Sequence, residues 1–150
     1  MDLDQAFDAA VRLELYRFFV DQGRPPVPAE IAEALPSDQA SVESSIHRLA
    51  DAHVLVLAPG TPYIWMANPL SAIPTPFTAE AKGRTWFGNC IWDALGIVAM
   101  VGGTGTVKTW CPDCNERLTV AIGDNRLAGG EGVIHFAVPA AGWWDDIGFN

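Results

Sequence analysis

The sequence predicts an α+β protein in which a helical lobe is followed by a mostly antiparallel sheet packed on a central buried helix. Apolar residues recur at helical spacing in the first third of the chain, and the stretch 89–101 is almost wholly apolar. Short segments typical of strands follow, separated by turn sequences. With 150 residues, of which 49% are hydrophobic, the chain can bury one core shared by two small lobes.

The helical lobe covers residues 1–68 and contains three expected helices. The first ends at the sequence Gly-Arg-Pro-Pro, residues 23–26, because glycine and proline stop a helix. Pro28 suits the first position of a short second helix, where its missing N–H costs nothing. Ser37 or Asp38 can cap the third helix by accepting a hydrogen bond from its first turn.

Two short strands, 54–58 and 63–66, complete this lobe as a hairpin, since Pro-Gly-Thr-Pro lies between them. Three helices and a hairpin are typical of a winged helix, which often binds DNA. This lobe, however, has four Arg and ten Asp or Glu residues, and a protein that binds DNA needs the opposite balance. We therefore expect no nucleic-acid partner and interpret the winged-helix-like lobe as a structural lobe or a lid.

Residues 69–80 are rich in proline and are expected to form an extended linker to a second lobe over residues 81–150. In that lobe a strand is expected over 84–87, and Asn89 is a good N-cap for the buried helix. Three further strands are expected over 106–110, 118–122 and 133–138.

Composition excludes several other classes of protein. No apolar run approaches the roughly 18 residues of a membrane span, and the N-terminal Met-Asp-Leu-Asp lacks the basic residues of a signal peptide. Three cysteines cannot all pair in disulfides within the chain, so they are better interpreted as thiols or metal ligands. With a formal net charge of −9, we expect an acidic cytoplasmic protein with no membrane partner.

The first candidate site is Cys90 with Asp93, in the sequence Gly-Asn-Cys-Ile-Trp-Asp. If Asn89 caps the helix, Cys90 lies in the first turn, where free amides and the helix dipole favour a thiolate. Asp93, three residues later, faces the same side. Two neighbouring anions resist double ionisation, so a Cys90 thiolate beside a protonated Asp93 is the expected resting state. The alternative is a buried small apolar side chain beside an ordinary carboxylate at a helix start.

The second candidate site is Cys111-Pro112-Asp113-Cys114, a C-x-x-C turn. Such a turn is half of a zinc knuckle or a redox motif, and no second C-x-x-C completes it. Its two thiols could bind a soft metal such as zinc or copper, alone or together with Cys90. The alternative is a tight turn between strands whose thiols happen to be close.

Residues 84–95, Arg-Thr-Trp-Phe-Gly-Asn-Cys-Ile-Trp-Asp-Ala-Leu, resemble the active-site segment of the organomercurial (alkylmercury) lyases. The similarity continues through Gly102 and Val107 to Cys111, and the acidic winged lobe before it also resembles that family. The resemblance covers most of the chain. Its most specific part is Gly-x-Cys-x-x-Asp, which joins a helix-start thiol to a carboxylate.

The resemblance implies an enzyme, a lyase that needs no cofactor. The thiol matching Cys90 binds the mercury of an organomercurial as thiolate, since soft mercury prefers sulfur. The carboxyl group matching Asp93 helps to move a proton to carbon, so that the carbon–mercury bond is cleaved by protonolysis. The cysteine matching Cys111 has a structural role in the family, and Cys114 is an addition.

The chain departs from the family in one respect. The family's active site uses a second catalytic cysteine on a later strand. Aligning residues 133–139 with the family's preceding strand places the start of that later strand at 148–150 and the cysteine just beyond Asn150. We therefore expect either a truncated form or a protein that has lost the second thiol.

Three functions follow as hypotheses. The first is an alkylmercury-lyase-like enzyme acting on a small organomercurial through Cys90 and Asp93. The second is a relative with the same fold that uses Cys90 as a covalent nucleophile and Asp93 as acid and base on a small organic, biosynthetic substrate. The third is a non-enzymatic protein that binds or senses a metal through Cys90, Cys111 and Cys114. An unpaired strand edge at the C-terminus also predicts either a homodimer or partial disorder at the C-terminus.

Overall fold

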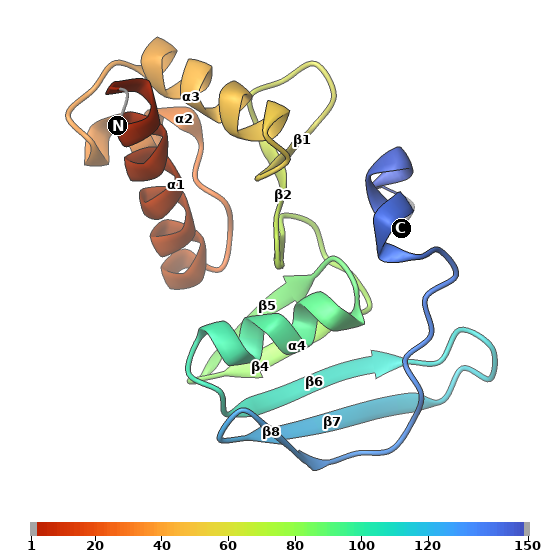
Figure 1. Ribbon diagram of the computed structural model, residues 1–150. Coiled ribbons are helices and arrows are strands. Elements are labelled where there is room, and N and C mark those ends of the chain that lie inside the picture. Colours follow the sequence, from red (N-terminus) through yellow and green to blue (C-terminus); the bar gives the residue numbers. More distant parts are fainter. Residues whose placement is uncertain (1–2, 149–150) are drawn as a thin grey trace.

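The computed structural model describes residues 3–148 and confirms the α+β class (Figure 1). Three helices form the N-terminal lobe: α1 (Leu3–Gln22), α2 (Pro28–Ala34) and α3 (Gln39–Asp51). Pro28 occupies the first turn of α2, and Asp38 caps α3 by accepting from the backbone N–H of Ser41 at 2.8 Å, so both local predictions are confirmed. Asp8 of α1 ties the lobe together by accepting from Arg48 and Ser45 of α3, each at 2.6 Å.

Among residues 3–148, eight strands form one sheet in which every neighbouring pair is antiparallel. The spatial order is β1-β2-β3-β5-β4-β6-β7-β8. The bounds are β1 (Val56–Leu57), β2 (Ile64–Ala67), β3 (Leu70–Ser71), β4 (Thr78–Ala81), β5 (Arg84–Gly88), β6 (Gly105–Trp110), β7 (Arg117–Gly123) and β8 (Arg126–Gly129).

The hairpin of the first lobe, β1 and β2, belongs to the same sheet as the strands of the second lobe. Residues 69–80, expected as a linker, contain β3 and most of β4. In the structure this segment is therefore part of the sheet, and the sheet continues through it from the first lobe to the second. The division into lobes at residues 68 and 81 stays a prediction.

Helix α4 (Ile91–Met100) lies across β4, β5 and β6, as Figure 1 shows. Its buried face consists of apolar side chains, because a helix covered by a sheet on one side must remove that side from water. The residues of this interface are Ala94, Ile97 and Val98 of the helix with Ala79, Trp86 and Val107 of the strands.

The strand expected over 133–138 does not form, and that expectation was wrong. The outer edge of β7 is instead paired with β8, which follows it through the turn at Asp124 and Asn125. Gly130 and Gly132 then take positive φ values of 110° and 143° and lead the chain away from the sheet. Two of the apolar residues that suggested the strand are left exposed, Val133 at 93% and Ile134 at 46%, whereas Phe136 packs against Trp143 of η1.

The C-terminal segment returns to the helical lobe. A short 3₁₀ helix, η1 (Ala140–Asp146), places Trp144 on His53 just after α3, with ring centroids 4.1 Å apart and nearly parallel planes. Because no strand occupies 133–138, the alignment that set the family's later strand at residues 148–150 loses its basis; residues 149–150 lie outside the described residues. No helix among residues 3–148 is long and apolar enough to cross a membrane.

Gly88, the last residue of β5, has no room for a side chain. A Cβ atom there would lie 2.5 Å from the backbone nitrogen of Ala94 in α4. We expect Gly88→Ala to lower the free energy of unfolding by about 1–3 kcal/mol, the usual cost of overpacking, as measured by thermal or urea unfolding.

Gly96 is the matched control, because it lies within α4 and a Cβ there would meet only the Pro69 ring at an ordinary 3.6 Å. Gly96→Ala should be neutral or stabilise by up to about 1 kcal/mol, since alanine is the better helix former. Equal destabilisation by the two substitutions would contradict the close contact at Gly88.

Candidate active site

The candidate site lies where β5 ends and α4 begins. Only Asn89 and Cys90 separate the last residue of the strand from the first residue of the helix. The expectation that Asn89 is the N-cap was wrong: Cys90 is the N-cap, with extended φ and ψ of −142° and −177°. Gly88 packs closely on the backbone of Ala94. We infer that this contact prevents the helix from beginning one residue earlier.

The thiol of Cys90 and the carboxyl group of Asp93 meet at the start of α4. The Cys90 thiol and the Asp93 carboxyl group lie close enough to influence each other's pKa, and the backbone N–H of Asp93 also acts on the Cys90 sulfur. Both side chains are half-buried. The structure therefore brings the two predicted residues together.

Asn89 holds the Asp93 carboxyl group, and Asn68 links Asn89 to the helical lobe. The Asn89 side-chain amide donates to Oδ2 of Asp93 at 3.1 Å and to Oδ1 of Asn68 at 3.0 Å. The hydroxyl of Tyr16, from α1, donates to the backbone oxygen of Asn68 at 2.8 Å. A chain of hydrogen bonds thus runs from the first helix of the protein to the carboxyl group beside the thiol.

Sequence reasoning missed Tyr16 and Asn68, and it assigned Asn89 a different role. Tyr16 and Asn68 meet across 52 positions of the sequence, so no local pattern could reveal their contact. The Oδ1 atom of Asn89 is buried and has no hydrogen-bond partner among the described residues. An unsatisfied buried acceptor is uncommon in folded proteins, which makes Asn89 a candidate functional residue.

Burial dominates the electrostatics of the pair. It raises the pKa of Asp93, opposed by hydrogen bonds from Asn89 and from the backbone N–H of Cys90. Burial also raises the pKa of Cys90, and the negative charge of Asp93 raises it further. The N–H groups of Trp92 and Asp93 lower the pKa of Cys90, as expected at a helix start, but they are outweighed. The raised pKa of Cys90 runs against the expected thiolate at rest, whereas the raised pKa of Asp93 agrees in direction with the expected protonated carboxyl group; the resting state stays a prediction.

Cys111 and Cys114 lie on the turn between β6 and β7. The backbone N–H of Cys111 donates to Glu116 O, and the N–H of Asn115 donates to Cys111 O, both at 2.8 Å, which closes the turn. The two thiols are within hydrogen-bonding reach, and N–H groups of Cys114 and Asp113 point at the Cys111 sulfur. These donors lower the pKa of Cys111.

The predicted metal-ligand set of Cys90, Cys111 and Cys114 is not assembled as one cluster. No group of three or more His, Cys, Asp or Glu side chains within residues 3–148 is placed to hold a metal ion. The structure instead separates a half-buried thiol–carboxyl pair from an outer dithiol pair.

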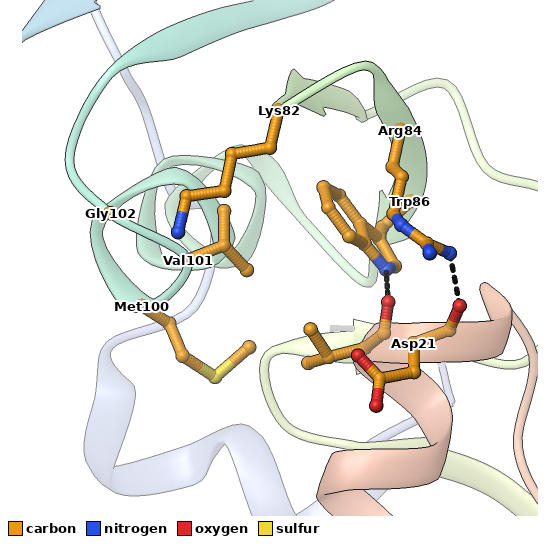
Figure 2. Close-up of a pocket in the computed structure, with 8 residues that line it drawn as sticks. Asp21, Lys82, Arg84, Trp86, Met100, Val101 and Gly102 are labelled. Atoms are coloured by element: carbon orange, nitrogen blue, oxygen red, sulfur yellow. Dashed lines mark hydrogen bonds between the residues drawn. The ribbon is translucent and has the colours of Figure 1, made fainter.

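A cavity of about 400 Å³ lies at the other end of α4, and Figure 2 shows the residues around it. Met100 and Gly102 come from the end of the helix, and Lys82 from the turn between β4 and β5. Two hydrogen bonds close its inner side: the Trp86 indole N–H donates to Val20 O at 3.1 Å, and the Arg84 guanidinium donates to Asp21 O. This cavity does not include Cys90.

The fold and the site together define an α+β protein that presents a thiol and a carboxyl group at the start of a helix with one buried face. The sequence profile of the alkylmercury lyase family (MerB) matches residues 70–149, which is more than half of the chain and includes all three cysteines. The chain belongs to the alkylmercury lyase family.

A solved structure, the mercury-bound form of MerB2, has a similar fold, with a TM-score of 0.63 and 21% sequence identity. The match covers 79% of this chain and 59% of that one, so the chain spans less than two thirds of the length of that relative. No curated protein matches the chain.

The electrostatics of the pair predict how alkylation of Cys90 depends on pH. Iodoacetamide reacts with the thiolate, so the midpoint of the rate against pH should lie above that of an exposed cysteine. Asp93→Asn removes the negative charge that raises the pKa of Cys90, and its midpoint should move to lower pH. Peptide mass spectrometry follows each cysteine separately.

Asp51→Asn, at the exposed end of α3, makes the same chemical change away from the pair and should leave the midpoint in place. A midpoint that does not move in Asp93→Asn would show that the carboxyl group has no electrostatic influence on the thiol.

Proposed function

We propose that the chain is an alkylmercury lyase in which Cys90 binds the mercury of a small organomercurial and Asp93 delivers a proton to the carbon. The observation that carries this proposal is the close approach of the Cys90 thiol and the Asp93 carboxyl group at the start of α4, where Cys90 is the N-cap and Asp93 lies in the first turn. Membership of the alkylmercury lyase family supports the choice of substrate. Mercury is here a substrate and product, and the proposal requires no cofactor.

The geometry supports a two-step proton transfer. As the sulfur–mercury bond forms, the Cys90 thiol loses its proton to the nearby Asp93 carboxylate. Asp93 then gives this proton to the carbon as the carbon–mercury bond breaks. The hydrocarbon leaves, and the mercuric ion stays on the Cys90 thiolate. One proton is moved twice, so the pair needs no separate base.

The environment of Asp93 suits this sequence of steps. Burial raises the pKa of its carboxyl group, so the protonated form is accessible nearer to neutral pH than for an exposed aspartate. The Asn89 amide holds Oδ2 at 3.1 Å and thereby limits rotation of the carboxyl group. We assign Asn89 as a positioning residue, supported by Asn68 and Tyr16 behind it.

A second candidate function is covalent catalysis by Cys90 on a small organic substrate, with Asp93 as acid and base. The observation that favours it is that only one thiol among residues 3–148 contacts Asp93, and covalent catalysis needs one. The same thiol–carboxyl pair would serve both reactions. Release of hydrocarbon from an organomercurial distinguishes them.

Hydrocarbon release measured by gas chromatography tests the proposal with a simple arylmercurial and an added small thiol. Cys90→Ser should reduce release to the uncatalysed rate, because oxygen is a poor ligand for soft mercury. Asp93→Asn should still bind mercury but should lower the rate about 10²–10⁴-fold, the range typical of a lost general acid.

Asp51→Asn is again the matched control and should release hydrocarbon at the wild-type rate. If wild type and Cys90→Ser release equal amounts, the protein is not a lyase of this kind. If Asp93→Asn keeps the wild-type rate, another group supplies the proton.

A further inference from the structure

The turn between β6 and β7 presents two thiols as one unit. Hydrogen bonds of 2.8 Å from Cys111 N–H to Glu116 O and from Asn115 N–H to Cys111 O fix its backbone. Cys111 and Cys114 lie within hydrogen-bonding reach of each other. Cys114 is exposed and Cys111 is half-buried, so a ligand can reach both sulfurs from solvent.

This dithiol lies at the same end of the sheet as Cys90. Thr78 of β4 is opposite Phe87 of β5 on one side and opposite Lys108 of β6 on the other. Because β5 and β6 are both antiparallel to β4, they run in the same direction. Cys90 follows Phe87 by three residues, and Cys111 follows Lys108 by three residues.

The row formed by Phe87, Thr78 and Lys108 sets the spacing of the two strands that lead to the sites. Phe87 and Lys108 are two strand spacings apart, or about 10 Å. Figure 1 shows the same relation: α4 crosses the sheet from one end, and β6 returns to that end before the turn. The strands that lead to the two sites therefore end at the same end of the sheet, although the three cysteines do not form one ligand cluster within the described residues.

We infer that Cys111 and Cys114 form a second mercury site, which takes up the inorganic mercuric ion left on Cys90 after carbon–mercury cleavage. The inference rests on the proposed function for the source of the ion. Two thiolates bind a soft divalent ion better than one, because each adds a sulfur–metal bond. Asp113 and Glu116 beside the thiols add negative charge that favours a cation.

The transfer is a ligand exchange with no change of oxidation state. Sulfur–mercury bonds form to Cys111 and Cys114, whose thiols release two protons. The bond from mercury to Cys90 breaks, and the Cys90 thiolate takes up one of these protons. The other proton goes to solvent. Cys90 is thereby restored for a further substrate, and the ion lies on the exposed turn.

Protection of thiols from alkylation tests this inference. The full chain is reduced with a phosphine, freed of reductant without oxygen, and mixed with one equivalent of mercuric chloride. Iodoacetamide is then added, and peptide mass spectrometry reports the alkylation of each cysteine against a metal-free sample. We expect Cys111 and Cys114 to be protected and Cys90 to be alkylated as in the metal-free sample.

Two sets of variants control the result. In Cys111→Ser/Cys114→Ser, and in Cys114→Ser alone, protection should move to Cys90. In Cys90→Ser the dithiol should remain protected. The affinity for mercuric ion in competition with glutathione should fall more than about 100-fold in the double variant, since loss of an outer-shell partner alone costs roughly 10–100-fold. Thermal unfolding checks that each variant is folded.

The same measurement of cysteine alkylation, made after one equivalent of an arylmercurial, tests the transfer. Cys90 should be alkylated in the wild type and blocked in the double variant. Protection of Cys90 with alkylation of Cys111 and Cys114 in the wild type, after either mercury compound, would overturn the inference. Mercuric chloride has no carbon–mercury bond, so the experiment with mercuric chloride does not depend on lysis. Protection of Cys111 and Cys114 without hydrocarbon release from an organomercurial would contradict the proposed lyase activity and still support the dithiol site.

Discussion

The close packing of Gly88 against the backbone of Ala94 is the constraint on which the candidate site depends. It fixes the end of β5 directly beside the first turn of α4, with two residues to connect them. Cys90 must therefore take an extended conformation as the N-cap, and Asp93 turns back toward it from the first turn of the helix. The thiol–carboxyl contact is thus a consequence of how one strand meets one helix.

This placement also explains why burial outweighs the helix dipole at Cys90. The donors of the first turn act on the sulfur and lower its pKa, but desolvation of the half-buried thiol outweighs them. Cys111 shows the opposite balance: similar backbone donors act on a sulfur with little desolvation, and its pKa falls. The buried thiol keeps a proton that it can pass to a carboxyl group, whereas the outer thiol is more readily a thiolate.

Much of the local structure could be predicted from the sequence because the signals are local. Pro28 at a helix start and Asp38 as a cap act within one turn. The apolar stretch correctly predicted a helix, but α4 buries only one face, and Trp92 and Met100 are exposed. The predicted strand over 133–138 failed because pairing depends on which segment reaches the edge of β7 first, and β8 follows it after two residues. Likewise, the pairing of Cys90 with Asp93 follows from helical spacing, but their raised pKa values and the support from Tyr16 depend on the tertiary packing of the two lobes.

The relation between the two thiol sites is a property of the sheet order and not of sequence spacing. In the chain β4 precedes β5, but in the sheet β4 lies between β5 and β6, so these two strands run in one direction and end together. If β6 paired directly with β5 as its antiparallel neighbour, Cys111 would lie at the end of the sheet opposite to Cys90. The central position of a four-residue strand, Thr78–Ala81, therefore decides that the strand leading to the half-buried Cys90 and the strand leading to the turn with the exposed Cys114 end at the same end of the sheet. Two separate thiol sites would suit the proposed reaction on mercury. Cleavage of the carbon–mercury bond needs a proton held near one thiol, and removal of the mercuric ion from that thiol needs stronger ligands elsewhere.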